Sequence, residues 1–94
     1  MAEGIDRDWR AMFRFADDIR HYCDNIKKVC GDLRSNMDSA RPLMRDEVSQ
    51  RALNKIEAFA NGLISGLPEA QRAENKLRKS AELLRAAEVL GNGI

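Results

Sequence analysis

The sequence has few of the residues on which most recognisable functional sites depend. Its 94 residues include one histidine, two cysteines and two prolines, and only 5% of them are aromatic. The cysteines and the single histidine do not by themselves complete a four-ligand zinc set. Domains rich in β-structure usually contain more aromatic and β-branched side chains. The composition therefore favours a helical chain and supplies no metal motif.

The sequence also lacks an excess of one charge and a long hydrophobic run. The 16 Lys and Arg residues against 15 Asp and Glu residues leave a net charge of +1, which gives no electrostatic reason to bind nucleic acid or an anionic membrane. The longest apolar stretch, around 59–67, is interrupted by polar residues and glycines, and the first ten residues contain no apolar stretch like that of a signal peptide. We therefore expect a single domain, 1–94, that is made in the cytoplasm and is not inserted in a membrane.

What the sequence does contain is a long apolar repeat in its first half. Eleven apolar residues follow one another in alternating steps of three and four: Trp9, Met12, Ala16, Ile19, Cys23, Ile26, Cys30, Leu33, Met37, Ala40 and Met44. The steps average 3.5 residues, which is the repeat of a helix packed along another helix. At 1.5 Å per residue this seam would run for about 50 Å.

The helix boundaries follow from capping residues and prolines. We predict a helix over about 5–40 with Asp6 as its cap, a turn over about 41–46 that contains Pro42, and a second helix over about 47–90 that Asp46 caps. The fold class is all-α, an antiparallel hairpin of two long helices. In the second helix we expect an apolar spine at Ile56, Leu63, Ala70, Leu77 and Leu84, with flanks at Ala52, Phe59 and Ala73 and at Leu53, Ala60, Leu67 and Ala81.

Residues 66–68, Gly-Leu-Pro, contradict a straight second helix. Two alternatives are open: a continuous helix kinked near Pro68, or a separate third helix that begins there. The nearby pattern Gly62-x-x-x-Gly66 permits close backbone approach, either as tolerance of a tight crossing or as a specific dimer contact.

The two cysteines lie on the predicted seam. Cys23 and Cys30 are seven residues apart, so their Cα atoms in a helix are separated by about 10 Å, too far for a disulfide within it. Buried thiols are the simplest interpretation. An interchain bridge and a metal site are the alternatives.

Both predicted helices have apolar faces wider than one neighbouring helix can cover. We therefore expect the hairpin to dimerise into a four-helix bundle. The predicted partner face consists of Phe15, Ile19, Tyr22, Ile26, Val29, Leu33, Ile56, Phe59, Leu63 and Leu67.

The sequence provides no convergent polar cluster for catalysis. Acids lie four residues from bases, as in Glu74 with Arg78, which is the spacing of ordinary exposed pairs on a helix. We predict no enzyme activity, no catalytic residue, no bound cofactor and no metal. Nucleic-acid binding is a weaker alternative, because acids interleave basic clusters such as Lys76, Arg78 and Lys79.

The turn motif Met44-Arg45-Asp46 lies near the midpoint of the sequence, between two long amphipathic segments. Phe15-Ala16 and Ile19 lie early in the first segment, and Ala52-Leu53 and Ile56 lie early in the second. Over about 5–90, this arrangement resembles the WXG-motif (ESAT-like) small proteins of type VII secretion systems, in the branch whose turn reads Trp-x-Asp. The resemblance implies a hairpin without enzyme activity, in which Met44 packs at the tip and Asp46 caps the second helix.

Two departures modify what the resemblance implies. Met44 stands in place of the tryptophan, and the segment AAEVLGNGI has no Tyr-x-x-x-Asp or Tyr-x-x-x-Glu export signal. The resemblance then implies a non-signalling subunit, exported by such a system or retained, whose partner is a similar hairpin in a homodimer or heterodimer, or the helical N-terminal domain of a secreted toxin. An unrelated small all-α homodimeric module is the alternative.

Overall fold

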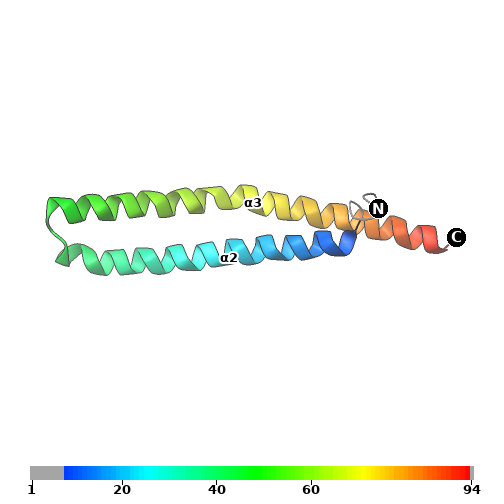
Figure 1. Ribbon diagram of the computed structural model, residues 1–94, viewed down its shortest axis with the longest axis horizontal. Coiled ribbons are helices and arrows are strands. Elements are labelled where there is room, and N and C mark those ends of the chain that lie inside the picture. Colours follow the sequence, from blue (N-terminus) through cyan, green and yellow to red (C-terminus); the bar gives the residue numbers. More distant parts are fainter. Residues whose placement is uncertain (1–7, 94) are drawn as a thin grey trace. The chain divides into compact units, whose positions relative to one another are not determined.

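The computed structural model describes residues 8–93, without the side chains of 92 and 93, and this part of the chain is almost entirely helical. Helix α2 (Trp9–Ala40) is joined to helix α3 (Glu47–Gly93) by the short 3-10 helix η1 (Arg41–Leu43), and the described part has no strand (Figure 1). The prediction of an all-α helical hairpin is therefore confirmed for residues 8–93.

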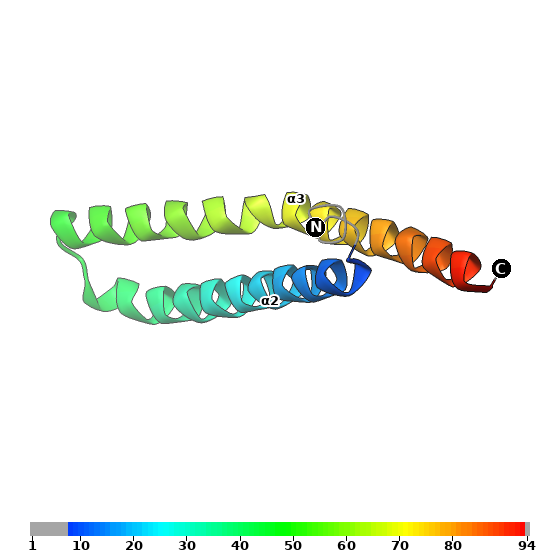
Figure 2. The ribbon, with the colours of Figure 1, turned by 45° about the vertical axis from the view of Figure 1, so that its right-hand side comes forward.

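The hairpin divides into two compact units, each of which contains a segment of both long helices. The terminal unit comprises Met1–His21 and Glu69–Ile94, and the turn unit comprises Tyr22–Pro68. Within each unit the two helical segments lie side by side (Figures 1 and 2). In the terminal unit Trp9 contacts Glu88 and Asp17 contacts Arg78, and in the turn unit Arg34 contacts Asn61 and Arg41 contacts Glu57. Later residues of α2 thus meet earlier residues of α3, so the segments are antiparallel in each unit.

Both long helices begin at an aspartate cap. Asp8 Oδ1 accepts hydrogen bonds from the backbone N–H groups of Arg10 and Ala11, so Asp8 caps α2. Asp6, the cap predicted from the sequence, lies outside the described residues. At the second helix, Asp46 Oδ2 accepts a 2.9 Å hydrogen bond from the backbone N–H of Ser49, which confirms Asp46 as the cap of α3.

Pro68 lies inside α3, which runs unbroken from Glu47 to Gly93. The alternative of a separate third helix is therefore wrong. A proline has no N–H to donate to the carbonyl four residues earlier, here that of Ile64, and its ring crowds that carbonyl. The rest of the helix is long enough to continue despite this local defect, and a kink at Pro68 stays a prediction.

The core of the turn unit is a single row of buried side chains from each helix. Cys23, Cys30 and Met37 from α2 are buried together with Leu53, Ala60 and Leu67 from α3. These residues recur every seven positions, as in antiparallel helix packing. Both cysteines are free, and the Cys30 thiol lies 3.8 Å from the carbonyl oxygen of Ala60, to which it donates a weak hydrogen bond. The cysteines are therefore buried thiols at the seam.

The core of the terminal unit is built from smaller residues and one acid. Ala16 and Ala81 are fully buried, and Glu74 is only 6% exposed. Near the start of α2, Trp9 packs edge-on against Phe13 with ring centroids 6.1 Å apart, and its indole N–H donates to Glu88 on α3. Two alanines and one glutamate are thus the buried residues at the seam of this unit.

The inner row of α3 differs from the predicted spine. The residues buried every seven positions are Leu53, Ala60, Leu67 and Ala81, with Glu74 between them, whereas Ile56 is exposed and Leu63, Ala70, Leu77 and Leu84 are half-buried. The apolar face of α3 is wide enough for either row to face inward. The row that contains Ala60 and Ala81 is the one that packs against the buried row of α2.

Candidate interaction face

An apolar flank of the turn unit is left without cover by its own chain. On α2, Tyr22 and Val29 are 58% and 60% exposed, and on α3 Phe59 is 67% exposed and Ile56 is 40% exposed. Ile26, Leu33 and Leu63 are half-buried beside them. Large apolar side chains are therefore accessible on both helices of this unit.

These side chains lie on one side of the hairpin because their positions relative to the buried row are the same on both helices. Tyr22 and Val29 come one residue before a buried cysteine, and Phe59 comes one residue before buried Ala60. Side chains one before and three after a buried position share a helix flank. In an antiparallel pair, residues at the same sequence distance before a buried position lie on the same side of the pair, whichever helix they belong to. We call this set the apolar face: Tyr22, Ile26, Val29, Leu33, Ile56, Phe59 and Leu63.

Polar contacts close the opposite side of the turn unit. Arg34 donates to the side-chain oxygen of Asn61, and Arg41 forms a 3.1 Å ion pair with Glu57. Each of these residues follows a buried position by one or four residues, which places it on the other flank. The hairpin is thus polar on one side and apolar on the other within this unit.

The structure places the ten predicted partner-face residues in three different settings. Seven form the apolar face of the turn unit. Phe15 and Ile19 belong to the terminal unit, where Phe15 is 57% exposed and Ile19 is half-buried. Leu67 was wrongly assigned to the partner face, because it is part of the inner row and only 5% exposed.

No family model, curated protein or solved structure matches this chain.

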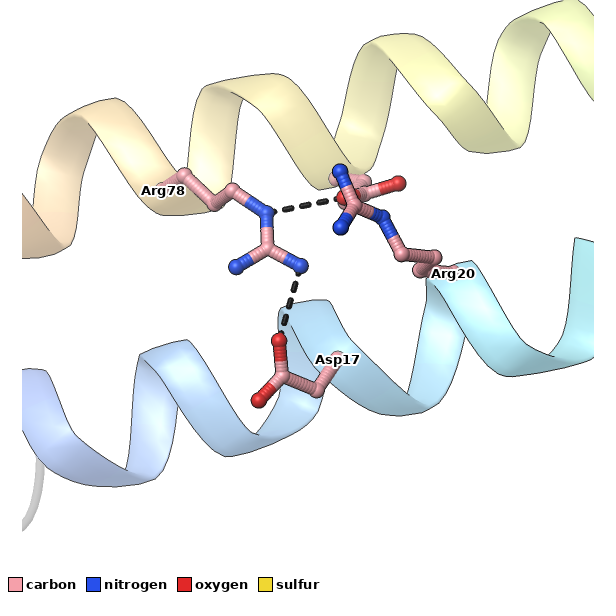
Figure 3. A network of polar contacts seen from close by, with 4 residues as sticks. Asp17, Arg20 and Arg78 are labelled. Carbon is pink, nitrogen blue, oxygen red and sulfur yellow. Dashed lines mark hydrogen bonds and ion pairs between the residues drawn. The ribbon is translucent and has the colours of Figure 1, made fainter.

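A polar network in the terminal unit centres on the buried Glu74 (Figure 3). Its carboxylate accepts a 2.8 Å hydrogen bond from Arg78, one turn further along α3, and lies 3.4 Å from Arg20 of α2. Arg78 also donates a 2.8 Å hydrogen bond across to Asp17 of α2. The bonds to Glu74 and Asp17 raise the pKa of the Arg78 guanidinium, because both carboxylates favour its charged form.

The burial of Glu74 is a feature that sequence reasoning missed. The spacing of Glu74 and Arg78 suggested an exposed pair, but the carboxylate occupies a place in the inner row that leucine or alanine fills elsewhere in α3. The signal was present in the sequence, since Glu74 lies seven residues after Leu67 and seven before Ala81. Every buried side-chain polar atom in the described residues has a hydrogen-bond partner, so the charge is compensated.

The turn motif is held by backbone contacts at the tip of the hairpin. Met44 is half-buried, and its carbonyl oxygen accepts a 2.5 Å hydrogen bond from the side chain of Gln50. The Arg45 side chain donates to the carbonyl oxygen of Pro42 at 3.0 Å. Hydrogen bonds from Ser49 lower the pKa of Asp46, because they favour its ionised form. These contacts order the turn, and they form no cluster of reactive groups.

The described residues offer little for other chemistry. They contain no group of three His, Cys, Asp or Glu side chains placed to hold a metal ion. Neither helix has, in this part of the chain, a stretch long and apolar enough to cross a membrane. A shallow hollow lies on α3 alone, lined by Glu82, Arg85, Ala86, Val89 and Leu90. The apolar face is therefore the feature of the described chain that is best suited to binding.

Proposed function

We propose that this protein is a non-enzymatic interaction protein that binds another helical chain through its apolar face. The observation that carries the proposal is the exposure of Tyr22, Val29 and Phe59 on one flank of the turn unit, opposite a flank closed by polar contacts. Contiguous exposed apolar patches on soluble domains mark interaction sites more often than scattered apolar residues do.

The energy available from covering this face is large compared with the stability of a small domain. An aromatic side chain buries about 150–250 Å². Tyr22 and Phe59, at 58% and 67% exposure, therefore leave roughly 250 Å² accessible between them. At about 25 cal/mol per Å², covering these two side chains would contribute up to about 6 kcal/mol, against a total domain stability of about 5–15 kcal/mol.

A partner of the same architecture would cover the face best. Two helices laid across the apolar face would complete a four-helix bundle, in which each helix packs against two neighbours. The binding partner in this proposal is thus a similar helical hairpin, in a homodimer or a heterodimer.

Within this class we propose a WXG-like small subunit or partner protein of a type VII secretion system or of its toxin substrate. Two long helices joined at the turn motif Met44-Arg45-Asp46, with Asp46 capping α3, support this assignment. An unrelated homodimeric all-α module is the second candidate. Met44 favours it, since a half-buried methionine stands where that family has tryptophan.

The test compares two substitutions at equally exposed apolar residues. Phe59→Ser removes the centre of the apolar face, whereas Leu83→Ser removes a side chain of α3 that is 66% exposed and lies outside that face. We expect light scattering at tens of micromolar to give twice the chain mass of 10.6 kDa for the wild type and for Leu83→Ser, and the single mass for Phe59→Ser.

A second arm tests the heterologous partner. If a type VII toxin is encoded beside the gene, its helical N-terminal domain is mixed with each variant, and a complex is expected that Phe59→Ser abolishes and Leu83→Ser retains. A wild-type chain that is monomeric and also binds no such domain would refute the proposed function.

A further inference from the structure

We propose that the partner is a second copy of this chain, and that α2 of each copy packs over the glycines of α3 in the other copy. This inference rests on the proposed function, because it assigns an occupant and an arrangement to the apolar face. Two features of the turn unit support this inference: large exposed side chains on α2, and a strip without side chains at Gly62 and Gly66 on α3.

The flat region of α3 consists of Gly62 and Gly66. Gly66 comes one residue before buried Leu67, so it shares the flank of Phe59, and Gly62 lies one turn earlier. A Cβ built at either glycine would meet no atom within 4 Å. The packing of the hairpin therefore does not require glycine at these positions, although glycine is unfavourable inside a helix. Close approach of another chain would require it.

The bulky flank of α2 lies level with these glycines. Contacts of Cys30 with Ala60 and of Arg34 with Asn61 set the register of the two helices in the turn unit. This register places Val29 level with the stretch between Gly62 and Gly66. A protruding side chain and a flat strip are thus presented side by side on one face.

Such a face is complementary to itself. Rotation about a two-fold axis parallel to the helices leaves the position of every residue along the helix axes unchanged. It brings α2 of one copy over α3 of the other. Val29 of the second copy then lies over the Gly62–Gly66 strip of the first, and the reciprocal contact forms by symmetry, as an isologous interface requires. A two-fold axis perpendicular to the helices would instead pack the flank of α2 that carries Tyr22 and Val29 against the same flank of α2 in the second copy.

Area and charge are both compatible with a second copy as the occupant. A standard interface buries about 800 Å² on each partner, of which about 60% is apolar. The exposed parts of Tyr22 and Phe59 would supply roughly half of that apolar area. With a net charge of +1 per chain, two copies have little mutual repulsion to overcome.

The decisive variant is Gly66→Leu, with Gly31→Leu as its matched control. Both glycines lie in the turn unit, and a Cβ at either one meets nothing within 4 Å, but Gly31 is on the polar flank of α2. Leucine favours the helix at both positions, so we expect both variants to keep or raise the melting temperature.

Sedimentation equilibrium should show that the dimer dissociation constant rises at least tenfold for Gly66→Leu and is unchanged for Gly31→Leu. Leucine adds apolar surface. If the face associated only through nonspecific hydrophobic contacts, Gly66→Leu would therefore dimerise more tightly than the wild type. An unchanged or tighter Gly66→Leu dimer overturns the glycine contact and leaves the proposed function standing. A wild-type chain that is monomeric in this measurement overturns the second copy as partner, and only the toxin-domain arm then decides the proposed function.

Cross-linking tests the arrangement separately. A mixture of Val29→Cys and Gly66→Cys chains should form a disulfide-linked heterodimer under mild oxidation, and neither variant alone should exceed the wild type, whose two cysteines are buried. Strong cross-linking of Val29→Cys alone would show that α2 packs on α2, which overturns the arrangement.

Discussion

Replacing the buried Glu74 by leucine should stabilise the protein. The carboxylate is 6% exposed in a row otherwise filled by leucine and alanine, so the leucine side chain would be buried in its place. Full burial of a leucine side chain is worth about 1.5–3 kcal/mol. The change therefore exchanges a compensated charge for apolar packing.

The polar partners of Glu74 limit how much is lost in this exchange. The side chain of Arg20 is 64% exposed, and that of Arg78, which is 24% exposed, keeps its 2.8 Å contact with Asp17. Replacing both members of a buried ion pair with apolar residues is commonly neutral or stabilising by about 1–4 kcal/mol, whereas removing one member destabilises a protein when the remaining charge stays buried and unpaired; after Glu74→Leu, Arg20 remains largely exposed and Arg78 remains paired with Asp17. We expect Glu74→Leu to raise the free energy of unfolding by about 1–2 kcal/mol, with about 4–8 °C in melting temperature for each kcal/mol.

Glu74→Gln is the matched variant, because it keeps the shape of the side chain and removes its charge. It leaves the two arginines without their common carboxylate and places an amide among apolar neighbours, so it should lower the stability. Urea unfolding followed by circular dichroism at one protein concentration measures both changes. A Glu74→Leu protein that is less stable than the wild type, or a Glu74→Gln protein that is more stable, would refute the reasoning.

Three further predictions concern the turn, the proline and the apolar face. Hydrogen bonds from Ser49 lower the pKa of Asp46 in the folded protein. The cap should therefore stabilise the protein fully above about pH 4 and progressively less as the pH falls through the lowered pKa. In urea titrations, the difference in stability between the wild type and Asp46→Asn should shrink on acidification. Pro68→Ala restores a backbone donor to the carbonyl of Ile64 and should raise the stability by up to about 3 kcal/mol, and a lower melting temperature would contradict the account of α3. Ile26→Asp introduces a charge beside the buried row and should dissociate the proposed dimer or unfold the chain, and unchanged helicity, melting temperature and mass would count against the assigned face.

Several elements of the fold can be predicted from the sequence. The helices, the turn around Pro42 and the cap at Asp46 follow from the spacing of apolar residues and from local hydrogen-bonding chemistry, which act over three or four residues. Exposure of Phe15, Tyr22 and Val29 was also predictable, because a face this wide exceeds what one neighbouring helix covers.

Other elements depended on a second helix that sequence spacing does not contain. Two overlapping apolar rows in α3 fit the same period, and packing against α2 selected the row with Leu53, Ala60, Leu67 and Ala81. The same selection buried Leu67, which had been assigned to the partner face, and enclosed Glu74, whose spacing from Arg78 looked like a surface pair.

Local patterns in the amino-acid sequence are sufficient to predict two amphipathic helices with a turn between them, since periodicity and capping are properties of neighbouring residues. Which flank of each helix faces the other helix and which stays exposed depends instead on how the two helices pack. Helix packing depends on the sizes and charges of side chains that lie dozens of positions apart in the sequence. A pattern of neighbouring residues contains no information on how such distant side chains fit together.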